Sequence, residues 1–384
     1  MHILFISNYF YPEQLPPTFR IISLARYWQR EGCLITVLTG FPNYPSGKIP
    51  PFYKGKLFMK ENIDGINVIR VPIFPSSNAG FLKRSISFFS FFASASCVGL
   101  FLKKRYSVVI ATIPPPLVGL SGYLISKIMK IPFLLEVRDL WPENVKDIGI
   151  SRNKILYMVL EEISAFLYRE SNLIVTVTNS FKSWLKEKYR IREGKVATIF
   201  PISDSVELDL GIKVNGDKFV VSYFGNFGLC QNMSTVIEAA KILKEYSDIK
   251  FILVGDGPER EKIIKLKEKN MLKNIEIFPT RPRVEMIKLY NESDACIVIL
   301  RNAAAMSLTL PSKLFEILNY GKPIILSIPE GEAKSIVENA NAGIWVKPDS
   351  PQDLSLAILF LKENRDKKIN FGSSGKTYFE NNYS

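Results

Sequence analysis

The 384-residue sequence contains a single histidine, His2, and it contains no D-x-D triplet. One histidine at the chain start excludes a Ser-His-Asp triad of the usual construction and any metal site built from several histidines. Without paired aspartates, metal-dependent chemistry has little support in the sequence. We therefore expect neither a metal nor a cofactor at the functional site.

Cysteine is also scarce, and no C-x-x-C pair occurs among Cys33, Cys97, Cys230 and Cys296. Isolated cysteines indicate free thiols in a reducing compartment. The first apolar run, residues 3–6, is too short for a cleavable signal peptide. Together these observations predict a cytoplasmic protein.

Acidic residues are outnumbered, with 37 Asp and Glu against 50 Lys and Arg, which gives a net charge of +13. Such an excess suits nucleic acid, anionic lipid or a phosphorylated substrate. The familiar nucleic-acid-binding motifs are absent, so we expect no nucleic-acid partner. Basic residues cluster in the first third of the chain, at Lys54/Lys56/Lys60, Lys83/Arg84 and Lys103/Lys104/Arg105. Two interpretations stay open for them, a solvated surface and contact with an anionic membrane.

Residues 85–102 lack charge altogether and lie between two of these basic clusters. This length meets the minimum for a membrane span. The segment also contains five serines and leads directly into an apolar run at residues 108–110, as a core helix of an α/β domain would. A membrane span, a core helix and a helix on the membrane surface are the three interpretations.

Short apolar runs alternate with helical patterns along most of the chain, which indicates parallel sheets covered by helices on both faces. The alternation lapses in a polar stretch at residues 202–218. We predict an α/β protein of two Rossmann-like, doubly wound domains, residues 1–203 and 218–384, joined by a linker at 204–217. Open parallel sheets bind ligands at the carboxyl ends of their strands, so we expect a ligand in a cleft between the domains.

A short helix is predicted within LTLPSKLFEILNYGKPIIL, residues 308–326, beginning at Ser312 and ending before Gly321. On this helix Lys313, Glu316 and Tyr320 share one face, while the apolar residues turn another way. The polar face must therefore look onto something other than the core.

The stretch YFGNFGLCQNMS, residues 223–234, predicts a strand, a loop with Gly225 and Gly228, and a helix start. Glycines let the backbone approach a diphosphate, and the free N–H groups of a helix start favour anions. A tight turn alone would also need glycine. In VGDGPEREK, residues 254–262, Arg260 stands where a dinucleotide-binding motif has its third glycine, which weakens a dehydrogenase interpretation.

Charged and aromatic side chains gather after another predicted strand in EVRDLWPEN, at Arg138, Asp139, Trp141 and Glu143. Unpaired charges are costly to bury, so Arg138 and Asp139 either pair with each other or serve the cleft. Their position at a strand end favours the cleft.

Several stretches occur in the order found in glycosyltransferase family 4, which the chain resembles over nearly its whole length: ISNYFYPE, LTGFPNYPSG, IATIPPP, VRDLWPE, FGNFG, VGDGP and PSKLFEILNYGKP. Within this family it is similar to the branch that makes O-antigen and capsular polysaccharide, such as L-fucosamine (N-acetyl-L-fucosamine) transferases. The resemblance implies the GT-B fold, with two Rossmann-like domains facing a central cleft, and a retaining mechanism.

The resemblance also implies roles for residues of the second domain. Glu316 matches the second glutamate of the family's E-x7-E element, which accepts hydrogen bonds from the ribose hydroxyls of the nucleotide. Ser312 and Lys313 would meet the donor diphosphate at the helix start. Arg281 would lie beside the base, and Arg301 would be a second phosphate ligand.

The chain departs from the family pattern at several positions. Leu308 occupies the place of the first glutamate, and Leu15-Pro16-Pro17 replaces an N-terminal glycine pair. Asn226 and Gln231 lie where relatives have basic residues. Lys313 and Arg301 would therefore have to neutralise more of the phosphate charge. No histidine is present on the acceptor side, where Asp139 is the nearest ionisable substitute.

The expected activity is that of a metal-independent, retaining glycosyltransferase of the hexosyltransferase class. It would move a sugar, with N-acetyl-L-fucosamine as the candidate, from a UDP-linked donor to a polyprenyl-diphosphate-linked saccharide at the inner face of a bacterial plasma membrane. Lys313 would stabilise the leaving group, and Asp139 would orient or partly deprotonate the acceptor hydroxyl. A UDP-sugar 2-epimerase of the same fold and a non-catalytic nucleotide-sugar-binding protein stay open, and the sequence predicts no oligomeric state.

Overall fold

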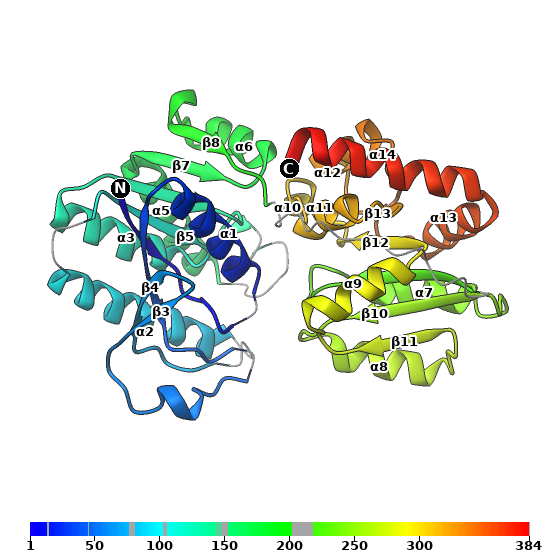
Figure 1. Cartoon of the computed structure of the whole chain (residues 1–384), viewed down its shortest axis with the longest axis horizontal. Helices are drawn as coiled ribbons and strands as arrows, with labels where there is room; N and C mark the ends of the chain where they lie inside the picture. Colours follow the sequence, from blue (N-terminus) through cyan, green and yellow to red (C-terminus); the bar gives the residue numbers. More distant parts are fainter. Residues whose placement is uncertain are drawn as a thin grey trace. The chain divides into compact units, whose positions relative to one another are not determined.

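The computed structural model describes residues 1–13, 15–44, 46–76, 81–102, 106–143, 146, 153–201 and 218–383. The chain divides into two compact units, Met1–Phe200 and Pro201–Ser384 (Figure 1). The division falls after Phe200, three residues before the predicted end of the first domain at residue 203. The predicted linker at 204–217 and the basic cluster Lys103/Lys104/Arg105 lie outside the described residues.

The first unit contains an eight-stranded sheet with the strand order β3-β4-β2-β1-β5-β6-β7-β8. Its strands are β1 (His2–Ile6), β2 (Leu34–Gly40), β3 (Met59–Ile63), β4 (Ile66–Val71), β5 (Val108–Ile113), β6 (Phe133–Val137), β7 (Leu173–Thr176) and β8 (Val196–Thr198). Neighbouring strands pair in parallel, except that β3 is antiparallel to β4. The order reverses between β1 and β5, and ligands of doubly wound sheets bind at such a switch point.

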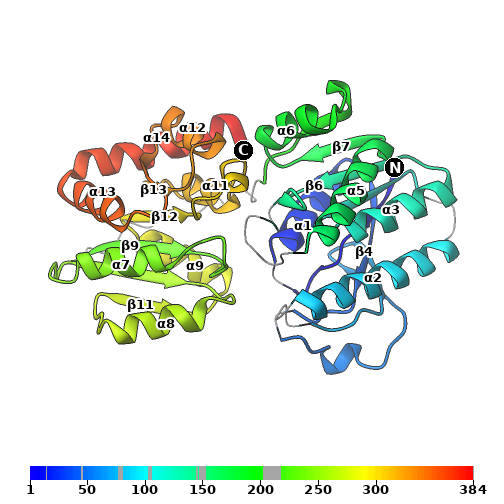
Figure 2. The same cartoon turned by 180° about the vertical axis from the view of Figure 1, so that it is seen from behind.

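Helices cover both faces of this sheet (Figures 1 and 2). On one face, α1 (Pro16–Arg30) packs against alternate residues of the central strands, such as Phe5 and Val37. On the other face lie α2 (Phe81–Phe101), α3 (Pro116–Met129) and α5 (Lys154–Glu170), with α3 in the middle. The remaining helical segments are α6 (Asn179–Tyr189) and the short turns η1 (Pro51–Tyr53) and η2 (Glu193–Lys195).

The uncharged segment forms most of α2, whose residues Leu82–Phe101 are long and apolar enough to cross a membrane by length and composition alone. Two of its serines bond to the domain, since Ser94 Oγ donates to the Pro72 carbonyl oxygen at 2.6 Å and Ser90 Oγ accepts from the Phe74 N–H at 2.7 Å. Phe91 and Ala95 are fully buried. The helix is therefore part of the α/β domain, and its outer face carries exposed apolar side chains at Leu82, Phe89, Leu100 and Phe101.

The second unit contains a six-stranded, all-parallel sheet with the order β11-β10-β9-β12-β13-β14. Its strands are β9 (Phe219–Phe224), β10 (Ile249–Val254), β11 (Ile275–Phe278), β12 (Ala295–Ile299), β13 (Ile324–Ser327) and β14 (Gly343–Val346). Its helices are α7 (Ser234–Ile242), α8 (Arg260–Lys269), α9 (Arg283–Glu292), α10 (Ala304–Ser307), α11 (Ser312–Asn319), α12 (Glu332–Asn339), α13 (Pro351–Glu363) and α14 (Arg365–Tyr383). The order reverses between β9 and β12, which makes the loops after these two strands the expected ligand loops.

One hydrophobic cluster of the second unit joins β9 and β10 to α7, α8 and α13. The strands are nearly continuous runs of buried apolar residues, as strands covered on both faces must be. The predicted α/β class, with two Rossmann-like doubly wound domains, is confirmed.

Candidate functional site

Two loops meet at the switch point of the second sheet. The loop after β9 contains Gly225, Asn226, Gly228 and Gln231, and the loop after β12 contains Arg301. The Arg301 N–H donates to the Cys230 carbonyl oxygen at 2.7 Å, which joins the loops. The structure thus brings together predicted site residues that lie some seventy positions apart in the chain. Within the first loop, the Gln231 side chain accepts from the Gly228 N–H at 3.1 Å.

Glycines make the close approach at this edge possible. A Cβ on Gly225, whose φ is +148°, would lie 2.4 Å from the Lys313 Nζ atom. A Cβ on Gly255, after β10, would lie 1.7 Å from the Gly225 carbonyl oxygen. The first glycine of VGDGP therefore lets two loops pack against each other, which accounts for it without a dinucleotide.

Lys313 lies in the first turn of α11, where no side chain caps the helix. Its Nζ donates to the Tyr223 hydroxyl at 2.9 Å and lies 4.0 Å from the centroid of that ring. The Tyr223 hydroxyl in turn donates to the Asn226 carbonyl oxygen at 2.6 Å. Burial lowers the pKa of Lys313 to about 7, although Glu316 opposes this shift. An arriving anion would restore the charge of this amine, and Ser312, exposed at the helix start, lies next to it.

Glu316 lies one turn further along the same face of α11. Its Oε2 accepts a hydrogen bond from the Tyr290 hydroxyl of α9 at 3.1 Å, and the Tyr290 ring stacks on that of Tyr320 with centroids 4.1 Å apart. Burial raises the pKa of Glu316, while the bond from Tyr290 and the charge of Lys313 lower it. The carboxylate is half-buried. Its position agrees with the predicted polar face, because the apolar residues Leu314, Ile317 and Leu318 are buried.

Arg281 lies further away, after β11, which β10 separates from β9. Its guanidinium is 5.3 Å from the Phe278 ring centroid and 3.6 Å from the Glu285 carboxylate. Its place beside a base stays a prediction.

In the first unit, the predicted acceptor-side residues follow β6. Burial raises the pKa of Asp139 to about 6, although the charge of Arg138 opposes this. Both side chains are half-buried. Trp141 packs edge to face on Phe88 of α2, and Glu143 forms an ion pair with Lys188 of α6. The four residues therefore share one loop but have different partners.

A buried ion pair that the sequence analysis missed supports this loop. Arg20 Nε of α1 lies 2.7 Å from Glu136 Oε1 at the end of β6, and both side chains are more than nine-tenths buried. The other guanidinium nitrogens donate to the carbonyl oxygens of Phe200 and Ile199 at 2.8 and 2.9 Å. No sequence signal connects residues 116 positions apart.

Glu13 is a second residue that was missed, although it lies in the quoted stretch ISNYFYPE. Its Oε1 accepts from the backbone N–H groups of Asn43 and Tyr44 at 2.9 and 2.8 Å, and so fixes the loop after β2. Burial raises the pKa of Glu13 to about 7. Near it in sequence, the buried Asn8 amide has no hydrogen-bond partner among the described residues. The sequence could suggest that this part of the motif needs polar side chains, but it could not show which groups those side chains contact.

Within the part of the chain that the structure describes, no group of three or more His, Cys, Asp or Glu side chains could hold a metal ion.

Two family models match the chain. The model described as Glycosyltransferase Family 4 matches residues 19–204, and the model described as Glycosyl transferases group 1 matches residues 209–378. Among similar sequences, the colanic acid biosynthesis glycosyl transferase WcaI of Escherichia coli (strain K12) is 24% identical over 354 residues, which cover 87% of this chain and 86% of WcaI. The glycosyltransferase WbjE of Pseudomonas aeruginosa is 23% identical over 265 residues, which cover 66% of each chain.

Solved structures share the architecture. Sucrose-phosphate synthase from Thermosynechococcus elongatus has a TM-score of 0.75 at 14% identity, over 99% of this chain and 94% of that one. HepE of Anabaena, in complex with UDP and glucose, has a TM-score of 0.68 at 15% identity, over 98% of this chain and 94% of HepE. At such identities the likeness shows the fold alone, and it confirms the expected GT-B fold.

Proposed function

We propose that this chain, which consists of a Glycosyltransferase Family 4 domain followed by a Glycosyl transferases group 1 domain, is a retaining, metal-independent glycosyltransferase with a UDP-sugar donor. HepE, which shares the fold, is named as a complex with UDP and glucose. WcaI is named for colanic acid biosynthesis, which supports a role in bacterial surface polysaccharide, such as O-antigen, capsule or lipopolysaccharide.

The observation that carries the proposal is the polar face of α11. It presents the Lys313 amine and the Glu316 carboxylate about one helical turn apart, at the switch point beside Gly225. A nucleoside diphosphate carries its negative charge and its ribose hydroxyls in neighbouring positions. The amine, Arg301 and the N–H groups of the helix start would hold the diphosphate, and the carboxylate would accept from the hydroxyls.

Lys313 and Arg301 of the second domain and Asp139 of the first would each have a part in the chemistry. As the sugar leaves the donor, negative charge builds on the diphosphate, and Lys313 and Arg301 stabilise that charge. Asp139, whose pKa of about 6 leaves it mainly ionised at neutral pH, would accept the proton or a hydrogen bond from the acceptor hydroxyl. The proposed sugar is N-acetyl-L-fucosamine, which the resemblance to L-fucosamine transferases implies.

UDP binding to the Glu316→Ala variant tests the ribose role. We expect affinity on the order of tenfold to a hundredfold weaker, because hydrogen bonds from two hydroxyls to a charged carboxylate are lost. Isothermal titration calorimetry measures the change, and Glu363→Ala, an exposed glutamate at the end of α13, is the matched control. Equal affinity of the Glu316→Ala variant and the unaltered protein would count against the ribose role. A sugar nucleotide that is epimerised without any acceptor would instead favour a 2-epimerase.

For the acceptor, we propose a polyprenyl-diphosphate-linked saccharide presented at the inner, anionic surface of the plasma membrane. The support is the outer face of α2, where Leu82, Phe89 and Phe101 are 72%, 62% and 81% exposed, together with the adjacent Lys83 and Arg84. Apolar side chains beside basic ones are typical of helices that lie on anionic bilayers.

Cosedimentation with vesicles that contain an anionic lipid tests the membrane contact. We expect Phe89→Ser to weaken binding by about tenfold, since one inserted aromatic side chain is withdrawn from the bilayer. Met271→Ser removes a side chain that is 83% exposed in the second unit and should leave binding unchanged. An equal loss of vesicle binding in both variants, or vesicle binding that does not depend on the lipid charge, would contradict a docking role for α2.

A further inference from the structure

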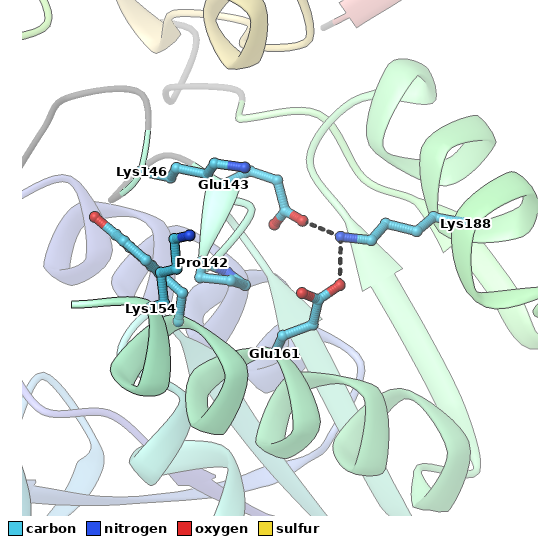
Figure 3. A pocket seen from close by; sticks show the side chains of 7 residues that line it. Pro142, Glu143, Lys146, Lys154, Glu161 and Lys188 are labelled. Carbon is cyan, nitrogen blue, oxygen red and sulfur yellow. Dashed lines mark hydrogen bonds and ion pairs between the residues drawn. The ribbon is translucent and has the colours of Figure 1, made fainter. Parts of the chain in front are cut away.

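A pocket of about 410 Å³ opens beside the loop after β6 (Figure 3). Its volume lies in the range of small-molecule sites, roughly 300–1,000 Å³. The lining residues come from this loop, from α5 and from α6: Pro142, Glu143, Lys146, Lys154, Tyr157, Glu161 and Lys188. Only Glu143 among them was predicted as a site residue. Because the loop follows β6, the pocket lies at the carboxyl end of a strand, where open α/β sheets bind ligands.

One side of the pocket is a fixed cluster of charges. The carboxylates of Glu143 and Glu161 approach Lys188 Nζ from two directions, with Glu161 Oε1 at 2.7 Å (Figure 3). The ammonium also lies 5.0 and 5.2 Å from the ring centroids of Trp184 and Tyr189. Burial lowers the pKa of Lys188, but the hydrogen bonds to the two glutamates raise it by a larger amount. The net effect is a pKa above the usual lysine value, so the lysine stays charged. One cation between two carboxylates leaves oxygen lone pairs that can accept hydrogen bonds from sugar hydroxyls.

Across the pocket from Lys188 lie two more lysines, Lys146 and Lys154 (Figure 3). Both are exposed, and within the described part of the chain neither is in an ion pair. The lining thus combines three lysines with two glutamates and has one excess positive charge. Lysine ammonium groups bind phosphates and carboxylates as point charges. The pocket therefore has a hydroxyl-accepting side and an anion-binding side.

We infer that this pocket is a subsite for the acceptor, and that it takes a sugar with an anionic group. The hydroxyls bind Glu143 and Glu161, and the phosphate or carboxylate binds Lys146 and Lys154. The inference rests on the proposed function, since a transferase needs an acceptor as well as a donor. Glu143 belongs to the same loop as Asp139, the residue proposed to contact the acceptor hydroxyl.

Binding of three probes to the full chain tests the inference: N-acetylglucosamine 1-phosphate, glucuronic acid and neutral N-acetylglucosamine. Saturating UDP keeps the phosphate probe out of the donor site. We expect the Lys154→Ala variant to bind the anionic probes about tenfold more weakly and the neutral sugar unchanged, because one charge-assisted contact is lost. The Glu161→Gln variant should weaken the binding of all three. Tighter binding of the phosphate or of the uronic acid by the unaltered protein identifies which anion the pocket takes.

Two matched controls lie on neighbouring surfaces. Lys127→Ala removes an exposed lysine of α3, and Glu162→Gln alters the exposed neighbour of Glu161 on α5. Neither should change the affinity for any probe. If no probe binds, or if Lys154→Ala and Glu161→Gln bind all three as the unaltered protein does, the inference is wrong. UDP affinity, measured on each variant, separates the two proposals, because loss of probe binding with intact UDP binding concerns the pocket alone. A chain that never binds UDP but binds anionic sugars through Lys154 would overturn the proposed transferase, and the acceptor role of the pocket with it, and would leave only a site for anionic sugars.

Discussion

Replacing Lys313 by methionine is expected to lower kcat/KM for sugar transfer from a UDP-sugar by about 10²–10³-fold, the range found when one preorganised donor to a developing oxyanion is removed. Methionine keeps most of the length and volume of the side chain, so most of the packing on Tyr223 and beside Gly225 should persist. Steady-state kinetics measures the loss. Lys265→Met, at an exposed position of α8, makes the same change of charge away from the site and should have no effect.

The pH dependence of UDP affinity reports on the same amine. Burial lowers the pKa of Lys313 to about 7, and only its charged form attracts the diphosphate, so affinity should fall as the pH rises. The groups that face it are Glu316 on its own helix and Tyr223 on β9, and burial raises the pKa of both. The Tyr223 hydroxyl therefore stays neutral in this range, and loss of a proton from Glu316 would weaken the binding of an anion in the same direction as loss of the charge on Lys313. Between pH 7 and 8.5 we expect a loss of about tenfold, which reflects the shrinking charged fraction. A flat profile in the unaltered protein, or unchanged kcat/KM in Lys313→Met, would contradict a phosphate role.

Replacing Arg20 by methionine should destabilise the first domain by about 3–5 kcal/mol, because the buried Glu136 carboxylate would lose the cation that contacts it directly. The carbonyl oxygens of Ile199 and Phe200 would lose their donors as well. Denaturant unfolding followed by a probe in the first domain measures the effect. The double variant with Arg20→Met and Glu136→Leu is the informative partner, since replacing both members of a buried pair by apolar groups is often nearly neutral.

The double variant should therefore be more stable than the single Arg20→Met variant, and equal destabilisation of the two would show that the ion pair is not the cause.

Stability should also depend on pH. Burial tends to raise the pKa of Glu136, but Arg20 and Arg138 outweigh it and hold the pKa below its usual value. A carboxyl whose pKa is lowered by folding contributes stability above its unfolded pKa and loses it as the pH falls through the folded pKa. Arg20→Met should reduce this acid-side component, because Arg138 would be the only cation left to lower the pKa of Glu136.

Much of the fold followed from local patterns. The apolar runs that became β9, β10 and β12 are buried along most of their length, and runs of this kind form parallel strands whatever their remote neighbours are. The helix at 312–319 was predicted to begin at Ser312 and to end before Gly321, one residue beyond its observed end. Glu316 was predicted on a different face from Leu314 and Ile317, because side chains three and four apart share a face of any helix.

The candidate site was less accessible to this kind of prediction. Glu316 bonds to Tyr290, and Lys313 bonds to Tyr223, which lie 26 and 90 residues away. The lysines of the pocket in the first unit come from a loop and two helices, and nothing in EVRDLWPEN indicates which of them face Glu143. Periodicity describes how a segment presents its own side chains. It does not describe which segment packs opposite, because that depends on the order of the strands.

The sequence by itself determined the α/β class, the two doubly wound halves and the polar face of the helix at 312–319, because each of these depends on residues close together in the chain. The tertiary structure alone decided that β9 lies beside β12, that Gly255 packs on Gly225 to leave room for Lys313, and that Arg20 neutralises Glu136. These contacts join distant residues through parallel crossovers, and the burial of the charges and hydroxyls involved shifts their pKa values only once the chain has folded around them.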